Sequence, residues 1–335
     1  MRLRRSDPNG PGLSRRRRGR GFSFHGPDGQ RVSAADEERI RELAIPPAWG
    51  DVWVAPDPRG HLQATGIDDA GRRQYLYHQE WRRQRDRQKH DRVLTMVPRL
   101  PDFRTIVEQQ LGGRGWHRDR TLAVALRMLD HGVFRTGGEE YAEQNGSYGV
   151  STLQRSQVRV RGNKIIFEYP AKSGISRRLS LHDPPLAHAV RCLQRLRTDT
   201  ERLLVFRSSC GMFQLAHPDD LNVRFKELTG GSFTVKDLRT WHATVSAAAA
   251  IAEQPRARST RAARRTELSV LRQVAAELGN TAAVARKSYV DPRIFDLYEH
   301  GDVIDPALHR RLSAEPADRA ARRALDEAVL RLLES

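Results

Sequence analysis

A tyrosine near the end of the chain carries the clearest chemical signal in the sequence. Tyr289 follows Asn280 by nine positions and comes shortly after two cations, Arg286 and Lys287. A phenol has an ordinary pKa of about 10, so it attacks an electrophile only where its proton is removed and positive charge surrounds it. These residue types indicate an aromatic hydroxyl brought up to a phosphate. The alternative is a helix that ends before Pro292 with one aromatic side chain packed inward.

Attack on a phosphodiester needs two further kinds of group. Negative charge develops on the non-bridging oxygens, and the forked guanidinium of Arg stabilises this charge best. The departing alkoxide needs a proton from a general acid, which Lys can supply when neighbouring cations lower its pKa. The chain offers Arg135, Arg239 and Lys172 for these roles. The alternative for each of these three residues, taken singly, is an ordinary charged side chain on the protein surface.

The local sequence around each cation favours contact with an anion. Arg135 precedes two glycines, Gly137 and Gly138, that let backbone approach a ligand closely. Arg239 lies in the first turns of an expected helix, and the dipole at that end of a helix also favours negative charge. Lys172 lies in the loop 170–174, which follows an expected strand, and a mobile ammonium there would reach a leaving oxygen.

The elements that must position these groups begin with a small β-rich domain. Residues 1–20 contain eight Arg and one Asp, with Gly and Pro between them, and are expected to be a disordered tail. Residues 21–84 are expected to form the β-rich domain. It would contain a hairpin of 22–25 with 30–32, a helix capped by Ser33, and strands at 51–55, 61–66 and 72–77. A polar helix over 79–90 would join it to the rest of the chain.

Helical patterns dominate residues 85–335. Helices are expected at 103–111, 118–131, 185–198, 219–228, 236–253, 260–278 and near 316–333. A β island interrupts them, with a hairpin of 158–160 and 165–169, the loop that contains Lys172, and a further strand at 175–181. The expected fold class is therefore α+β: a β-rich domain followed by a larger, mainly helical domain whose β island carries Lys172.

Composition and charge restrict the partners. The 335-residue chain has a formal net charge of +17 and a pI near 10.8, which favours a polyanion, with nucleic acid ahead of an acidic membrane surface. Cys192 and Cys210 form neither a disulfide framework nor a zinc knuckle. No apolar run approaches the roughly 18 residues of a membrane span, so a soluble cytoplasmic protein is expected. Phosphate-loop, zinc-protease and dinucleotide motifs are absent, so no metal or cofactor is expected.

Taken in order, the reactive residues resemble one family. The series Arg135, Lys172, Arg239, Asn280 and Tyr289, in a helical domain with the Lys on a β hairpin, is similar to the catalytic domain of type IB DNA topoisomerases. The poxvirus and bacterial branch is the nearest match. The resemblance runs from about residue 21 to 300, with both domains in the family order. It is carried by the stretches 71–77, 134–141, 167–172, 236–240, 278–281 and 288–289.

This resemblance implies a reaction that uses neither ATP nor a metal. Tyr289 would attack one strand of duplex DNA, which forms a 3′-phosphotyrosine link and frees a 5′-hydroxyl. The free end would swivel, supercoils would relax, and the 5′-hydroxyl would reseal the strand. Arg135 and Arg239 would clamp the scissile phosphate, and Lys172 would protonate the 5′ oxygen.

Asn280 departs from much of the family, which has His at this position. An amide N–H can donate a hydrogen bond to a non-bridging oxygen but cannot carry charge or shuttle a proton, and bacterial members also have Asn here. At about 100° per residue, Asn280 and Tyr289 would fall on opposite faces of one straight helix. We therefore expect a break or a separate short helix between them, with Tyr289 on a segment that can shift when DNA binds.

By the same resemblance, side chains outside the reacting group would contact the duplex. On an alternating strand Tyr75 and Tyr77 share one face and Gln74 lies on the other. The alternative for the two strand tyrosines is ordinary strand packing, and for Tyr141 it is core packing. Two basic domains joined by a helix indicate a monomer that clamps around duplex DNA. The candidate DNA contacts are Arg72, Arg73, Gln74, Tyr75, Tyr77, Tyr141 and Lys236.

Two other functions compete with this interpretation. A site-specific tyrosine recombinase uses the same phosphotyrosine chemistry, but usually has His three residues before the second Arg, where this chain has Lys236. Recombinases also begin with a helical domain, whereas residues 21–77 have the pattern of strands. A non-catalytic basic DNA-binding protein would explain the charge, but not the ordered set of Arg, Lys, Arg, Asn and Tyr.

Overall fold

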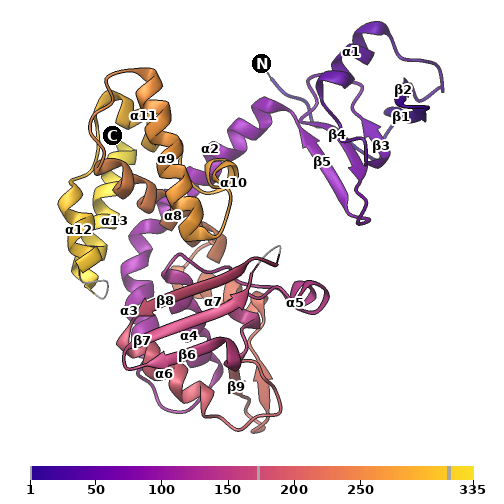
Figure 1. Cartoon of the computed structure of the whole chain (residues 1–335). Coiled ribbons are helices and arrows are strands. Elements are labelled where there is room, and N and C mark those ends of the chain that lie inside the picture. Colours follow the sequence, from indigo (N-terminus) through magenta and orange to yellow (C-terminus); the bar gives the residue numbers. More distant parts are fainter. Residues whose placement is uncertain (1, 172–173, 315–317) are drawn as a thin grey trace. The chain divides into compact units, whose positions relative to one another are not determined.

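Two parts of the chain, which meet after His90, form separate units. The computed structural model describes residues 2–171, 174–314 and 318–335, without the side chain of Tyr141. The first unit contains a five-stranded antiparallel sheet, and the second is mainly helical with two smaller sheets (Figure 1). The α+β class is confirmed. The two units divide after His90, within helix α2 (Gln79–Met96), whereas a boundary near residue 84 was expected from the sequence.

The first unit is built on one sheet with the strand order β2-β1-β3-β4-β5. Its helix α1 begins where Ser33 caps it, since the Ser33 hydroxyl accepts a hydrogen bond from Asp36 N at 3.1 Å. Val54 and Ala64 are fully buried in the small core beneath the sheet. The elements are β1 (Leu13–Arg18), β2 (Gly21–His25), α1 (Ala34–Glu42), β3 (Gly50–Val54), β4 (Leu62–Ile67) and β5 (Arg73–Tyr77).

One expectation for this unit is wrong, and another is confirmed only in part. Residues 13–18 were placed in a disordered tail, but they form β1, because Leu13 is buried in register with Val54 and Arg15 donates to three backbone carbonyls of residues 45–49. β2 was expected to pair with residues 30–32, and this hairpin is confirmed in part: His25 forms an antiparallel bridge with Arg31, and Val32 N donates to Phe24 O at 3.2 Å. Over its whole length β2 also pairs with β1, which was not expected.

Two buried helices lie at the centre of the second unit. Leu122 and Leu126 of α4 and Leu238 and Trp241 of α8 are each 0% exposed. The helices are α3 (Leu100–Leu111), α4 (Arg118–Asp130), α5 (Glu139–Asn145), α6 (Pro184–Gln194), α7 (Pro218–Thr229), α8 (Val235–Ala252), α9 (Thr260–Leu278), α10 (Ala282–Ser288), α11 (Arg293–His300), α12 (Pro306–Ala314) and α13 (Arg319–Glu334). No described helix has the length and apolar character needed to cross a membrane.

The β island is an antiparallel sheet of β6 (Val158–Arg161), β7 (Lys164–Pro170) and β8 (Ser176–His182), with β7 in the middle (Figure 1). The predicted hairpin of β6 with β7 is confirmed. Ile165, Phe167 and Tyr169 alternate along β7 and are buried in the main core. Lys172 comes between β7 and β8 in the sequence and lies outside the described residues. A second small sheet, β9 (Val205–Arg207) with β10 (Phe213–Leu215), was not anticipated.

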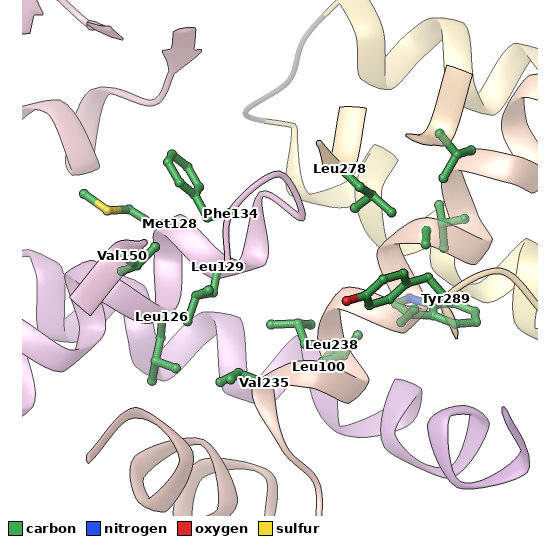
Figure 2. Packing of buried hydrophobic residues seen from close by; sticks show 14 of the residues in the cluster. Leu100, Leu126, Met128, Leu129, Phe134, Val150, Val235, Leu238, Leu278 and Tyr289 are labelled. Atoms are coloured by element: carbon green, nitrogen blue, oxygen red, sulfur yellow. The ribbon is translucent and has the colours of Figure 1, made fainter. Parts of the chain in front are cut away.

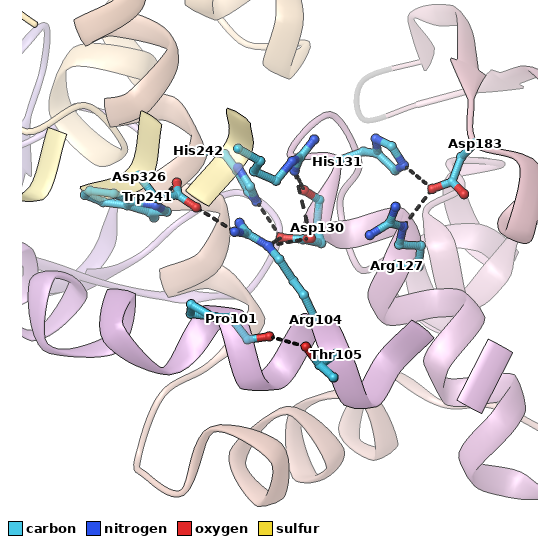
Figure 3. A network of polar contacts seen from close by, with 11 residues as sticks. Pro101, Arg104, Thr105, Arg127, Asp130, His131, Asp183, Trp241, His242 and Asp326 are labelled. Atoms are coloured by element: carbon cyan, nitrogen blue, oxygen red, sulfur yellow. Dashed lines mark hydrogen bonds and ion pairs between the residues drawn. The ribbon is translucent and has the colours of Figure 1, made fainter. Parts of the chain in front are cut away.

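A buried polar network connects the last helix to the centre of this unit (Figure 3). Arg104 of α3 donates to Asp130 at 2.9 Å and to Asp326 of α13 at 2.6 Å. Asp326 also accepts from the indole N–H of Trp241 at 2.8 Å, and Asp130 contacts His242 at 3.2 Å. Burial acts to raise the pKa of Asp130, but Arg104 and His242 hold it well below its usual range. Asp130 is therefore buried as a charged group, and α13 is fixed to this network through Asp326.

We predict that Asp326→Ala destabilises the second unit. The substitution leaves Arg104 with a single carboxylate and Trp241 without its acceptor, so the free energy of unfolding should fall by about 3–5 kcal/mol. Denaturant unfolding followed by circular dichroism measures this loss. The control is Glu327→Ala on the same helix, which removes an exposed ion pair with Arg323 and should change stability by less than about 1 kcal/mol. Equal losses in the two variants would contradict the prediction.

Candidate active site

Arg239 lies at the point where three separate segments of the second unit meet. It sits one turn into α8 and is 6% exposed. Its guanidinium donates to the carbonyls of Gly132 at 3.3 Å and Phe134 at 2.7 Å, in the loop after α4, and to Leu278 O at 2.5 Å, at the end of α9. Arg239 therefore joins the loop that carries Arg135 to the segment that carries Asn280.

The phenol ring of Tyr289 lies against the same guanidinium. The central carbon of Arg239 is 5.3 Å from the centroid of the Tyr289 ring, which is within range of a cation–π contact. Burial, and then the charge of Arg135, lower the pKa of Arg239 to about 10, against a smaller raising effect of Tyr289. At neutral pH the Arg239 side chain is therefore still a cation, and it lies directly beside the phenol.

Arg135 and Asn280 contact each other. Nη2 of Arg135 donates to Oδ1 of Asn280 and to the carbonyl of Gly279 at 3.3 Å. The backbone of Arg135 is fixed from the other side, because its carbonyl accepts from Val150 N at 2.9 Å. The structure thus brings Arg135, Arg239, Asn280 and Tyr289 together from four elements, as the sequence predicted.

The loop after Arg135 uses glycine for close packing of backbone. Gly137 has a φ of +94°, and a Cβ on Gly149 would lie 2.5 Å from the backbone of Gly137. Gly137 thus permits a close approach to Gly149. This packing of backbone against backbone holds the Arg135 loop in one conformation.

The predicted break between Asn280 and Tyr289 is confirmed. Helix α9 ends at Gly279, which has a φ of +63°, a left-handed conformation that favours glycine. Thr281 then caps the short helix α10, since its hydroxyl accepts from Val284 N at 3.3 Å. Tyr289 stands at the other end of α10, with its backbone N–H bonded to Ala285 O at 3.0 Å. With the turn at Gly279 and the seven-residue α10 between them, the Asn280 side chain contacts Arg135 and the Tyr289 ring contacts Arg239.

Tyr289 is also part of the hydrophobic core. It is 9% exposed, and Figure 2 shows it among buried apolar side chains on a different segment from Phe134 and Leu278. Thr244 of α8 holds the backbone on its far side, where the Thr244 hydroxyl accepts from Asp291 N at 3.1 Å. The two interpretations of this tyrosine from the sequence are therefore compatible: it packs inward, and it does so beside the cations.

Arg177 is a member of this group that sequence reasoning missed. It lies on β8 opposite Tyr169 and donates to Val133 O at 2.9 Å and to the carbonyl of Glu277. A Cβ on Gly279 would be 2.0 Å from Nη1 of Arg177, so Gly279 is needed for space as well as for its φ. The available signal was alternation: Arg177 shares a face of β8 with the half-buried Leu179 and Leu181.

Several buried donors at this site have no acceptor among the described residues. They are Nδ2 of Asn280, Nε of Arg239 and Nε of Arg177. A buried donor without a partner costs about 1–3 kcal/mol, so native structures keep few of them. Charge on Arg135 and Arg177 also lowers the pKa of Arg239, after the larger effect of burial, which shows that the cations influence one another. Unused donors within a cluster of cations fit an anion with several acceptor oxygens, such as a phosphate beside the Tyr289 phenol.

Comparison with known proteins decides the family. A model of the catalytic core of eukaryotic DNA topoisomerase I matches residues 78–299, well over half of the chain. A model of the N-terminal domain of bacterial DNA topoisomerase IB matches residues 21–68. The chain belongs to the type IB DNA topoisomerase family. It is 28% identical over 295 residues to DNA topoisomerase 1B of Acanthamoeba polyphaga mimivirus, across 86% of this chain and 88% of that relative.

As a type IB topoisomerase, the chain is an isomerase that relaxes supercoiled duplex DNA through transient cleavage of one strand. The resemblance inferred from the ordered residues is thereby confirmed. Neither matched model describes a recombinase or a non-catalytic DNA-binding protein. Among the residues that the structure describes, no group of three or more His, Cys, Asp or Glu side chains is arranged to hold a metal ion.

The remaining predicted residues of the topoisomerase have varied surroundings. Lys172 lies outside the described residues, and so does the side chain of Tyr141, whose backbone belongs to α5. Lys236 is exposed in the first turn of α8. In the first unit, Tyr75 and Tyr77 are 46% and 37% exposed, and their rings stack at 6.2 Å.

The polar residues next to these two tyrosines in the sequence differ in exposure and in hydrogen-bond partners. Arg73 is exposed on β5. Arg72 forms an ion pair with Asp68 at 2.8 Å, and the same carboxylate accepts from Nε2 of Gln74 at 2.9 Å. Gln74 is thus half-buried on the face of β5 opposite Tyr75, where Asp68 holds its amide.

We predict that Arg177→Ala loosens the site locally. The substitution removes the bonds that tie β8 to the Arg135 loop and to the end of α9. Amide hydrogen exchange should therefore become faster at residues 277–281, where local opening exposes the backbone. Arg178→Ala is the matched control, because Arg178 is the exposed neighbour and pairs with Glu168 at 3.0 Å on the surface. Unchanged exchange in Arg177→Ala would show that Arg177 does not hold this segment.

Proposed function

We propose that Tyr289 is the nucleophile of the topoisomerase reaction and that Arg135, Arg239 and Asn280 bind the scissile phosphate. The observation that carries the proposal is the contact of the Tyr289 ring with a buried, charged Arg239. A cation at this position would stabilise the negative charge that the phosphate develops as the oxygen of Tyr289 attacks. The oxygen of Tyr289 would form a bond to phosphorus while the bond from phosphorus to the 5′ oxygen breaks.

The two arginines would exchange their present acceptors for phosphate oxygens. Arg239 is bonded to backbone carbonyls and Arg135 to an amide oxygen and a carbonyl, all of them neutral acceptors. Hydrogen bonds from a guanidinium to a charged oxygen are roughly twice as strong as those between neutral groups. A phosphate therefore competes well for these donors. The forked geometry then stabilises the charge that grows on the non-bridging oxygens as Tyr289 attacks.

Asn280 would add a neutral donor to the same phosphate. The contact of Arg135 with Oδ1 orients the amide, and Nδ2 is buried without an acceptor among the described residues. A phosphate oxygen at Nδ2 would satisfy this donor. We assign Asn280 no part in proton transfer, since an amide does not titrate at neutral pH.

Lys172 would protonate the departing 5′ oxygen. Two observations support this role of Lys172: its position in the sequence between β7 and β8, and the contacts that hold these two strands at the site. Tyr169 of β7 stacks on Phe134 with ring centroids 6.5 Å apart, and Arg177 of β8 bonds to Val133 O. Both strands next to Lys172 are thus fixed to the loop that presents Arg135.

DNA binding by the whole chain would involve both units. We propose that the topoisomerase acts as a monomer that clamps around the duplex, in the cytoplasm where bacterial chromosomal DNA lies. The exposed pair Tyr75 and Tyr77 would contact a groove, with Arg72, Arg73 and Gln74 beside them. Tyr141 and Lys236 would contact phosphates near the cleavage site. The formal net charge of +17 supports such a large contact with a polyanion.

We predict that the wild-type chain relaxes supercoiled plasmid in EDTA without ATP and that Tyr289→Phe does not. The variant keeps the ring against Arg239 but lacks the oxygen that forms the covalent bond. Gel electrophoresis of plasmid topoisomers measures relaxation, and denaturation during the reaction traps any protein attached to DNA. Attachment at the 3′ end is expected. Relaxation by Tyr289→Phe at the wild-type rate would refute the role of Tyr289, and attachment at the 5′ end would refute the polarity.

We predict that Asn280→Ala slows single-turnover cleavage by about 1–3 kcal/mol of lost hydrogen bonding to the charged oxygen, roughly 5- to 150-fold. Asn280→His should retain most of the rate, because an imidazole N–H can replace the amide donor. Rates are measured with excess protein and an end-labelled duplex. A cleavage rate of Asn280→Ala close to wild type would remove the proposed role of Nδ2.

A further inference from the structure

β1 holds four consecutive arginines whose surroundings differ sharply. Arg15 donates to the carbonyls of Ile45, Pro46 and Trp49, at 3.1, 3.0 and 2.5 Å. Its guanidinium carbon also lies 4.2 Å from the ring centroid of Phe22. Arg15 is therefore a structural residue that fastens β1 to the loop before β3. It is not available to a ligand.

Arg16, Arg17 and Arg18 are exposed, and no carboxylate among the described residues forms an ion pair with them. Several other arginines of this unit differ in this respect. Arg4, Arg39, Arg41, Arg59 and Arg72 each pair with an Asp or Glu of their own surroundings. Three neighbouring cations without counter-charges repel one another, and a polyanion relieves that repulsion.

The register of the sheet decides where these cations point. Leu13 is paired with Val54, Val54 with Ala64, and Ala64 with Leu76, and these residues pack in the core. Ser14 is paired with Trp53, Trp53 with Thr65, and Thr65 with Tyr75. The side chains of this second row lie on the face of the sheet opposite the core. Since side chains alternate along a strand, Arg16 and Arg18 share a face with Tyr75 and Tyr77. Arg15 and Arg17 lie on the core face.

We propose that Arg16 and Arg18 form a phosphate-binding site for the same duplex that Tyr75 and Tyr77 contact. The proposal rests on the proposed groove contact of β5. β1 lies three strand intervals from β5 in the order of the sheet. Arg16 and Arg18 follow Ser14, the last residue of β1 that is paired with β3, and they pair with β2 on the far side. A duplex whose groove receives Tyr75 and Tyr77 would continue over this face of the sheet, where its phosphates would meet the two cations.

β1 lies outside the residues that the bacterial N-terminal domain model matches, since that match begins at residue 21. Contacts to phosphates position a protein on DNA without reading its sequence. The site therefore strengthens binding of any duplex, and it plays no part in the chemistry at Tyr289.

Three single substitutions that remove the same charge test the proposal: Arg16→Ala, Arg18→Ala and Arg17→Ala. Equilibrium binding of a fluorescent duplex is measured by anisotropy over a series of salt concentrations, in the Tyr289→Phe background so that no covalent complex forms. Arg16→Ala and Arg18→Ala should each weaken binding and lower the slope of log K against log salt by about 0.9. Arg17→Ala should keep the slope of the parent, and Arg16→Lys should restore most of it.

Two outcomes would overturn the proposal. Equal slopes in all variants and parent would show that the β1 cations are merely solvated. An equal fall for Arg17→Ala would show a diffuse basic region without a preferred face. Failure of the proposed function would be seen separately, as relaxation of plasmid by Tyr289→Phe, because the binding assay does not depend on catalysis. Thermal unfolding of each variant shows that β1 remains folded, and Tyr75→Ala in the same assay tests the contact of β5.

Discussion

The site depends on a buried guanidinium that no carboxylate in the described part of the chain neutralises. Arg239 and Arg104 are both nearly inaccessible, yet their partners differ in kind. Arg104 is held between the carboxylates of Asp130 and Asp326, so its charge is compensated within the fold. Among the described residues, Arg239 is bonded to three backbone carbonyls and lies against the Tyr289 side chain, and it has no carboxylate partner. The free energy cost of burying its charge is only partly offset, and an anion that enters the site would offset the rest.

The same imbalance extends to the neighbours of Arg239. Arg135 and Arg177 both act to lower the pKa of Arg239, after the larger effect of burial, so three like charges share one region. They are held together by carbonyls at helix and loop ends, which present partial negative charge. A structure that stores repulsion in this way binds phosphate through relief of the repulsion as well as through new hydrogen bonds. This part of the binding energy arises at the phosphate that reacts, so it can stabilise the transition state there.

The sequence allowed good prediction wherever the decisive information was local. Helix α9 has the predicted bounds because Ser259 caps its start and Gly279 ends it, and both signals are adjacent to the helix. The separation of Asn280 from Tyr289 by a break followed from helical geometry. The place of Arg177 and the anchoring of α13 could not be predicted, because they depend on distant partners. Arg104 and Asp326, for instance, are 222 positions apart. The role of Lys172 stays a prediction.

β1 shows why amino-acid composition alone gave a wrong prediction of disorder for this segment. Four arginines in a row favour disorder, because like charges repel and no apolar side chain among them can be buried. The strand forms because Leu13 enters the core and Arg15 satisfies three carbonyls, and these two residues secure the register for their neighbours. Once the register exists, alternation gives each arginine a separate environment. One run of identical residues thus supplies a structural fastening on one face and two unpaired cations on the face that carries Tyr75. A count of charges could not separate these roles, since they differ only in which side of the sheet each guanidinium occupies.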